Sequence, residues 1–391
     1  MTDVATIRAF LDEPHVALAG EVGRFAGERL STLPRADDDA AARKQAREIL
    51  ALLGEAGWSR HAVPAEHGGA SERIDLRACC LIREALAAAS PLADAVFALQ
   101  CLGSMPLALA GGDEVKSRWL PAVAAGKAMA AFAMTEPEAG SDVGSMTTRA
   151  VRDGYNYKLD GAKTLISNAG IADFYTVFAL TEPGAGARGL TAFVVPADAQ
   201  GVHLLAPQVM SAPHPLGEIA FDAVRLHLDW RLGEEGEGFK IGMRTLDRLR
   251  ATVAAAACGM AARALEEALA HARRRRQFGK ALAEFQMIQG KLAVMATELA
   301  AARLLVYRAA AEADHGAQRV TLESAMAKSY ATEAAQRIVD QAVQIVGGRG
   351  VLADHPVDHL YRSVRALRIY EGATEVQHLI IARELLRDGP A

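Results

Sequence analysis

Residues 239–278, FKIGMRTLDRLRATVAAAACGMAARALEEALAHARRRRQF, contain no proline and are rich in alanine. Alanine is the strongest helix former, and at about 1.5 Å per residue this stretch predicts a rod longer than most helices of globular proteins. Two further long helical patterns follow at 284–314 and 318–346, and a shorter pair follows Pro356. Together they predict a helical bundle over residues 235–391.

The segment before this bundle has a different texture. Between 128 and 234, short runs such as AAFAM, FYTVFAL and LTAFVV are interrupted by Gly, Pro, Asn and Asp. No helix-length segment separates them, so a parallel βαβ sheet is disfavoured and an antiparallel β-sandwich or barrel is expected. Residues 1–127 show apolar residues at three- and four-residue steps, as in 75–90 and 113–126. We therefore predict a multi-domain α+β protein with an N-terminal all-α domain, a middle β-domain and a C-terminal helical bundle.

The composition excludes several classes of protein. The 391 residues include 43 Lys and Arg against 47 Asp and Glu, which gives no overall basic field for nucleic acid or anionic lipid. The cysteines have neither zinc-site nor disulfide-framework spacing and are expected to be buried thiols in a reducing compartment: Cys79, Cys80, Cys101 and Cys258. The start of the chain is acidic, and the apolar stretches near 122–134 and 252–262 are too short to span a membrane. We expect a soluble cytoplasmic protein with no membrane span.

Two loop segments carry groups suited to ligand binding. Residues 135–142, TEPEAGSD, combine small and hydroxyl side chains whose backbone amides can bind a planar polar ligand or a phosphate. The same composition is typical of a hydrogen-bonded turn. Residues 273–279, RRRRQFG, end the longest helix. Their arginines either form a solvated face that complements the helix dipole or clamp a diphosphate.

Two later segments pose similar alternatives. The run Gly348–Ala353 matches a dinucleotide fingerprint, but a helical pattern precedes it and Pro356 follows, which favours a helix stop. In residues 369–377, IYEGATEVQ, Thr374 and Gln377 have the spacing of a capping box. Glu371 then lies just before a helix, where it either interacts with the helix dipole or acts as a general base. His355 and His359 have no evident third ligand, so no metal site is predicted.

Taken in order, these segments resemble the acyl-CoA dehydrogenase family. The further stretches LDGAKTLISNAG, LGEEGEGF and LDRLR extend the resemblance over nearly the whole chain. It implies an oxidoreductase with FAD that converts an acyl-CoA, or another acyl thioester, to the 2-enoyl thioester. Glu371 matches the family's base, which removes the α-proton while flavin N5 accepts the β-hydride, and its own N–H is implied to hold the thioester carbonyl oxygen. Some members place the base where this chain has Leu249, which cannot take a proton.

The resemblance also assigns binding residues. Those implied to contact FAD are Phe132, Met134, Thr135, Gly140, Ser141, Leu165, Ile166, Ser167, Thr374 and Glu375. Those implied to reach the FAD of a neighbouring subunit are Arg275, Gln277, Phe278, Gln286, Gln344, Gly347 and Gly348. Those implied to contact substrate are Ser141, Asp247, Arg250, Tyr370 and Gly372. The chain departs from the family at Leu165, where many members have tryptophan, at Ser167, where threonine is common, at Glu138, and in the loop 210–215.

Cofactor sites shared between subunits imply a homo-oligomer, expected to be a tetramer. The resemblance implies an electron-transfer flavoprotein as electron acceptor. Within the same fold, an oxidase that uses oxygen and a biosynthetic dehydrogenase acting on a carrier-protein thioester are alternatives. A non-catalytic flavoprotein that binds nucleic acid through the arginine run is an alternative from a different class. The net charge of -4 and the presence of Glu371 argue against it.

Overall fold

The computed structural model describes residues 4–317 and 319–387, which form two compact units. The helical unit comprises Met1–Leu33, Leu76–Asp94 and Asp247–Ala391, and the sheet unit comprises Pro34–Asp75 and Ala95–Leu246. Each unit is described by itself. The predicted domain limits 1–127, 128–234 and 235–391 stay a prediction.

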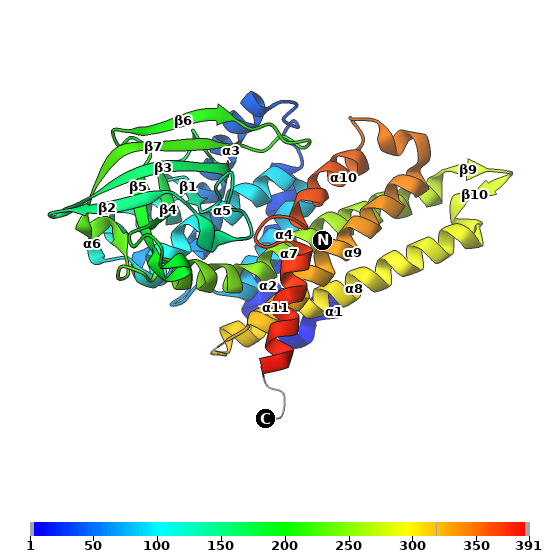
Figure 1. The fold of residues 1–391 in the computed structure, drawn as a ribbon. Coiled ribbons are helices and arrows are strands. Elements are labelled where there is room, and N and C mark those ends of the chain that lie inside the picture. Colours follow the sequence, from blue (N-terminus) through cyan, green and yellow to red (C-terminus); the bar gives the residue numbers. More distant parts are fainter. Residues whose placement is uncertain (1–3, 318, 388–391) are drawn as a thin grey trace. The chain divides into compact units, whose positions relative to one another are not determined.

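Long helices dominate the helical unit (Figure 1). The α-helices of this unit are α1 (Val4–Ile7), α2 (Glu13–Phe25), α4 (Leu76–Ala89), α7 (Gly238–Arg274, of which the part from Asp247 belongs here), α8 (Gln286–Asp314), α9 (Thr321–Val346), α10 (Pro356–Leu367) and α11 (Thr374–Arg387). Helix α9 packs against α8, α10 and α11, and α4 packs against α8. Gly259 on α7 allows a close approach to α4, because a Cβ there would lie 2.1 Å from the carbonyl oxygen of Glu84.

The longest helix is shorter than predicted at its C-terminal end. Helix α7 stops at Arg274, and a small hairpin follows, with β9 (Arg276–Gln277) antiparallel to β10 (Lys280–Ala281). Its two turn residues, Phe278 and Gly279, both have positive φ, at 50° and 82°. Positive φ at both central positions is the geometry of tight hairpin turns, although Asn and Gly usually supply it.

The sheet unit holds one eight-stranded sheet and its flanking helices, α3 (Asp39–Glu55), α5 (Pro91–Ala110) and α6 (Asp113–Ala124). The strands are β1 (Ala130–Ala133), β2 (Arg149–Asp153), β3 (Asn156–Ser167), β4 (Phe174–Leu180), β5 (Leu190–Pro196), β6 (Val202–Pro207), β7 (Leu216–His227) and β8 (Arg231–Leu232). Their order is β6-β7-β3-β2-β4-β5-β8, with β1 paired to β4. The β1–β4 and β2–β4 pairings are parallel, and the others are antiparallel. Helical termini around a middle β-sheet region confirm the predicted fold class.

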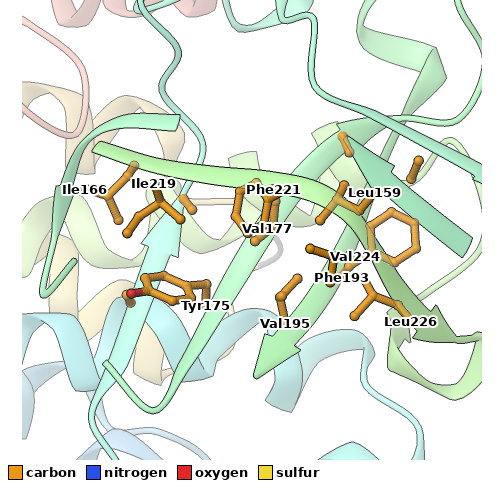
Figure 2. Close-up of a cluster of buried hydrophobic side chains, with 14 of the residues drawn as sticks. Leu159, Ile166, Tyr175, Val177, Phe193, Val195, Ile219, Phe221, Val224 and Leu226 are labelled. Carbon is orange, nitrogen blue, oxygen red and sulfur yellow. The ribbon is translucent and has the colours of Figure 1, made fainter. Parts of the chain in front are cut away.

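Packing in the core of this sheet determines which way the side chains at the end of β3 point. Ile166 is 2% exposed and belongs to a cluster of buried side chains in which it lies beside Ile219 (Figure 2). Successive side chains on a strand point to opposite faces. Leu165 and Ser167 therefore point away from this core, and Leu165 is 58% exposed.

Helix α5 is long and apolar enough to cross a membrane by length and composition, which the sequence analysis did not notice. However, 78% of its apolar window is buried inside the structure, as in the core helix of a soluble protein. The four cysteines are free and buried, as predicted. Within residues 4–317 and 319–387, no group of three or more His, Cys, Asp or Glu is arranged to hold a metal ion.

Candidate active site

The turn of residues 368–373, between α10 and α11, carries Glu371 and is called the base turn. Glu371 and Gly372 both have a left-handed backbone, with φ of 52° and 94°. This conformation is unfavourable for a side-chain-bearing residue such as glutamate and has to be imposed by its surroundings. A side chain at Gly372 would have to displace the Gln377 amide, because a Cβ there would lie 2.4 Å from the Nε2 atom of Gln377.

Helix α9 holds the base turn in place. The Nζ atom of Lys328 donates to the carbonyl oxygen of Gly372 at 2.7 Å, and Gln377 donates to the same oxygen at 2.9 Å. At the other side of the turn, Glu333 accepts hydrogen bonds from Arg368 at 2.7 Å and from Thr374 at 2.8 Å. The backbone on both sides of Glu371 is therefore held by side chains of α9 and by Gln377 of α11.

The predicted capping box at the start of α11 is wrong. Thr374 lies inside the helix and donates to Glu333, and the Gln377 amide bonds the base-turn carbonyls. Glu333 of α9 and the carbonyl oxygens of the base turn bind these two side chains in place of the helix's own backbone N–H groups. The spacing nevertheless placed the helix start within one residue.

Gly372→Ala is expected to disturb the base turn without unfolding the protein. The new Cβ has to displace the Gln377 amide, and alanine at a φ of 94° adds about 1–3 kcal/mol of backbone strain. We expect a lower rate of anaerobic flavin reduction by acyl-CoA and a modest fall in Tm. Gly316→Ala, at a positive φ with open space just after the end of α8, is the matched control for backbone strain alone and should leave the rate unchanged.

The Glu371 carboxyl group is recessed. Burial raises its pKa, although the charges of Arg83, Lys328 and Arg250 act in the opposite direction. Its Oε2 atom is buried and has no hydrogen-bond partner among the described residues. The base turn is nevertheless partly accessible, and its residue Tyr370 is 40% exposed. A desolvated carboxyl group that has no hydrogen-bond partner and lies on a partly accessible turn is suited to accept a proton from a bound molecule.

Three cations face this carboxyl group within the helical unit. Arg83 is buried and makes a two-pronged ion pair with Asp94, at 2.7 and 3.0 Å, and donates to Thr252 at 2.9 Å. Burial lowers the pKa of Lys328 to about 8. These positive charges limit how far burial can raise the pKa of Glu371.

The predicted substrate residues Asp247 and Arg250 are brought together on α7. Arg250 donates to Asp247, which also accepts from Thr321 at 2.8 Å. The Nε atom of Arg250 is buried and without a partner among the described residues. Leu249 between them is 2% exposed. The structure therefore has a buried carboxylate oxygen at Glu371, and the position between Asp247 and Arg250 holds a buried side chain that cannot take a proton.

In the sheet unit, a buried ion pair supports the loop 135–142. Lys163 is fully buried and donates to Glu136 at 2.8 Å and to the carbonyl oxygen of Met134 at 3.1 Å. Burial alone would raise the pKa of Glu136, but Lys163 and the hydrogen bonds from Thr148 and Thr147 lower it to about 2. This pair, which the sequence analysis missed, keeps the beginning of the loop rigid.

The C-terminal part of the loop 135–142 is available to a ligand. Gly140 and Ser141 are exposed and make no hydrogen bond within the described part of the chain, and a Cβ at Gly140 would meet open space. Nearby, Phe132 packs on Phe178 with ring centroids 5.0 Å apart, and Met134 is buried. Rigid apolar strand residues followed by unused amide and hydroxyl groups fit the polar edge of a flavin.

The trio Leu165, Ile166 and Ser167 presents one hydroxyl and one apolar side chain. Leu165 has a φ of 56°, and its exposed side chain occupies the position where the family often has tryptophan. Ile166 is turned into the core, so only its backbone is available to a ligand. The Oγ atom of Ser167 lies 2.7 Å from Nε2 of His214.

The residues implied to reach a neighbouring subunit's FAD are all exposed on the helical unit: Arg275, Gln277, Phe278, Gln286, Gln344, Gly347 and Gly348. Burial lowers the pKa of His271, and Arg275, His355 and Arg349 lower it further, so the end of α7 lies near the segment that follows α9. Phe278 is 93% exposed. Glu375 is exposed in the first turn of α11, whereas Thr374 is buried.

The comparisons with known proteins agree along the whole chain. The N-terminal, middle and C-terminal domain models of acyl-CoA dehydrogenase match residues 12–127, 131–224 and 236–386. The chain belongs to the acyl-CoA dehydrogenase family. It is accordingly a flavoprotein oxidoreductase with FAD as cofactor, and its class of activity is acyl-CoA dehydrogenation.

Individual relatives cover nearly the full length of this family member. The "probable acyl-CoA dehydrogenase fadE25" of Mycobacterium leprae is 38% identical, over 96% of each chain. The "Caffeyl-CoA reductase-Etf complex subunit CarC" of Acetobacterium woodii is 38% identical, over 87% of this chain and 90% of its own length. The solved structure of butyryl-CoA dehydrogenase from Megasphaera elsdenii has a TM-score of 0.90 at 32% identity, covering 96% of this chain and 99% of its own.

Proposed function

We propose that this protein removes the α-proton of an acyl-CoA with Glu371 and forms the 2-enoyl thioester. The observation that carries the proposal is the unpartnered, recessed carboxylate oxygen of Glu371 on a turn fixed by α9. The backbone N–H of Glu371 makes no hydrogen bond within the described residues, and we assign it to the thioester carbonyl oxygen. There it stabilises the negative charge that develops as the α-proton leaves. FAD, when bound, accepts the hydride from the β-carbon.

We assign the flavin to the loop 135–142 and to the trio Leu165, Ile166 and Ser167 of the sheet unit. The hydrogen-bond donors of Gly140 and Ser141 are unused, and the buried ion pair between Lys163 and Glu136 holds the start of the same loop. Both observations support this assignment. Asp247, Arg250, Tyr370 and Gly372 are assigned to substrate. The free, buried cysteines support a reducing, cytoplasmic location.

The electron acceptor is proposed to be an electron-transfer flavoprotein. The relative from Acetobacterium woodii is named as a subunit of a complex with such a protein, and also as a reductase. The same base can return a proton in the reverse reaction, so an enoyl-CoA belongs among the compounds to test.

The purified, FAD-loaded protein tests this function. Under anaerobic conditions, titration with acyl-CoAs of different length and branching should bleach the flavin absorbance with at least one of them. Addition of an electron-transfer flavoprotein should then restore the colour faster than air does. Faster recovery in air would instead indicate an oxidase. A protein that takes up FAD but is reduced by no acyl-CoA, and by an acyl-carrier-protein thioester instead, would contradict the proposed substrate.

We further propose a homotetramer in which the exposed residues 275–278 meet a neighbouring subunit's cofactor. Phe278 has a positive φ, which is an uncommon conformation for a bulky residue, and 93% of its surface is exposed and available for such a contact. Phe278→Ala is expected to weaken FAD retention about five- to tenfold, as loss of an aromatic anchor does, with little change in the monomer's helical content. FAD titration measures the affinity, circular dichroism measures the helical content, and sedimentation measures the oligomeric state. Equal FAD affinity in the variant would contradict the assignment, and Tyr155→Ala, on an exposed turn of the sheet unit, is the control.

A further inference from the structure

The loop 210–215, which departs from the family pattern, and Gln208 just before it hold the end of β3 by hydrogen bonds. Gln208 accepts a hydrogen bond from the backbone N–H of Leu165 at 2.9 Å and donates to Thr164 Oγ1 at 2.9 Å. The backbone N–H of Asn168 donates to the carbonyl oxygen of Pro215, also at 2.9 Å. Residues 164–168 are therefore bonded at both ends to the segment 208–215. Residues of this unusual segment therefore contact Leu165 and Ser167 and can position them.

His214 is the side chain of this loop that reaches Ser167. Its Nε2 atom lies 2.7 Å from the Ser167 Oγ atom. Pro213 and Pro215 flank His214 and restrict its backbone. Burial, together with the charge of Arg43, lowers the pKa of His214 to about 4, so the ring is neutral near pH 7. A neutral imidazole has one donor and one acceptor nitrogen, so it can hold a hydroxyl group in a single orientation.

The identity of residue 167 explains why such a partner is needed. Threonine, common at this position in the family, is β-branched and stiff about χ1, whereas serine rotates more freely. A serine hydroxyl has one proton and two lone pairs. If it accepts a hydrogen bond from a fixed donor, its own proton must point elsewhere. The histidine thus supplies the orientation that the missing methyl group would have given.

We propose that His214 is a positioning residue for the flavin: its Nε2–H group donates to Ser167 and directs the serine proton toward the cofactor. This inference rests on the proposed function, in which Ser167 contacts the flavin. The pair then stabilises one oxidation state of the flavin more than the other, because the flavin edge that accepts a hydrogen bond when oxidised carries a proton when reduced. The reduction potential of bound FAD reports this preference without any substrate.

The test compares His214→Leu, which removes the bond, with His214→Gln, whose amide can replace the Nε2–H donor. The midpoint potential of bound FAD is measured by equilibration with a redox dye, and FAD affinity by titration. One hydrogen bond is worth up to about tenfold in equilibrium constant, which for a two-electron couple corresponds to about 30 mV. We expect a shift approaching this size in His214→Leu and most of the wild-type value in His214→Gln. His203→Ala, at an exposed position of β6, should shift nothing.

A double variant separates positioning from general disruption of the loop. In a Ser167→Ala background, His214→Leu should add no further shift, because the group it orients is gone. An equal shift in both backgrounds, or none in His214→Leu, overturns the inference. If Ser167→Ala leaves the potential unchanged while acyl-CoA still bleaches the flavin, the inference falls and the proposed function stands. If no acyl-CoA bleaches the wild-type flavin, the proposed function falls, and the potentials still decide the role of His214.

Discussion

Glu371→Gln is expected to slow anaerobic flavin reduction by acyl-CoA at least about 10²- to 10⁴-fold, the usual contribution of a general base. Glutamine has the shape of glutamate but cannot accept the α-proton. The hydrogen bonds that fix the base turn go to the backbone oxygen of Gly372 and to Glu333, so the turn itself is preserved. Stopped-flow bleaching with the acyl-CoA that reduces the wild-type flavin fastest measures the rate. Glu312→Gln, which removes a surface ion pair of α8, is the control.

Glu371→Gln should still bind substrate, since the backbone N–H of residue 371 remains in place and Arg250 is unchanged. A variant that binds acyl-CoA and reduces flavin at the wild-type rate would show that the base lies elsewhere. In the wild type, the rate should increase with pH through a value above the ordinary glutamate pKa, because burial raises the pKa of Glu371. The residual rate of the variant should lack this dependence.

The same substitution is expected to increase stability above the ordinary carboxyl pKa. A carboxyl group whose pKa is raised by folding binds its proton more tightly in the native state. Ionising it therefore lowers the free energy of unfolding as pH rises from the unfolded-state pKa through the native one. Glutamine never ionises, so the stability gain in Glu371→Gln should be present at pH 8 and shrink toward pH 4. Thermal unfolding at the two pH values measures it. A variant less stable than wild type at pH 8 would contradict this sign.

Periodicity predicted the elements of this fold well, since long alanine-rich helices and short β-rich runs are signals carried by neighbouring residues. Periodicity failed where residues adopt a backbone conformation or a degree of exposure that is unusual for their type. The hairpin after Arg274 turns on Phe278, a residue that is not a turn signal, so the helix was extended through it. The short strand β6 is exposed along most of its length and lacks the alternation of a half-buried strand.

The candidate site, like the fold, could be predicted from the sequence only in part. The motifs that carry Glu371 and the loop 135–142 are contiguous in sequence, and the family resemblance finds them. Their supports are pairs of residues far apart in the chain, such as Lys328 with Gly372 and His214 with Ser167. No spacing rule links such residues. The only local signal is a charged residue inside an apolar run, as with Arg83 in CCLIREALAAA, and such a residue does not reveal its partner.

Arg83→Met is expected to destabilise the protein by about 3–5 kcal/mol, the usual effect of removing one partner from a buried ion pair. Both side chains are 2% exposed, and the guanidinium group uses two of its nitrogens on Asp94 and a third on Thr252. Without Arg83, Asp94 remains as an uncompensated buried charge. With the usual unfolding entropy per residue, this change corresponds to a fall of about 4–6 °C in Tm for a chain of 391 residues. Circular dichroism of the FAD-loaded protein during heating measures it.

Removing both charges distinguishes the ion pair from simple loss of packing. Arg83→Met combined with Asp94→Leu should recover most of the lost stability, because apolar residues of similar volume replace a buried pair well. Arg308→Met, which breaks an exposed pair on α8, should change stability by less than about 1 kcal/mol. The pair also acts on the base: Arg83 lowers the pKa of Glu371 and Asp94 raises it. The single Arg83 variant should therefore move the pH–rate profile upward and Asp94→Leu downward, while the double variant stays near the wild type. A double variant as unstable as Arg83→Met would assign the effect to packing.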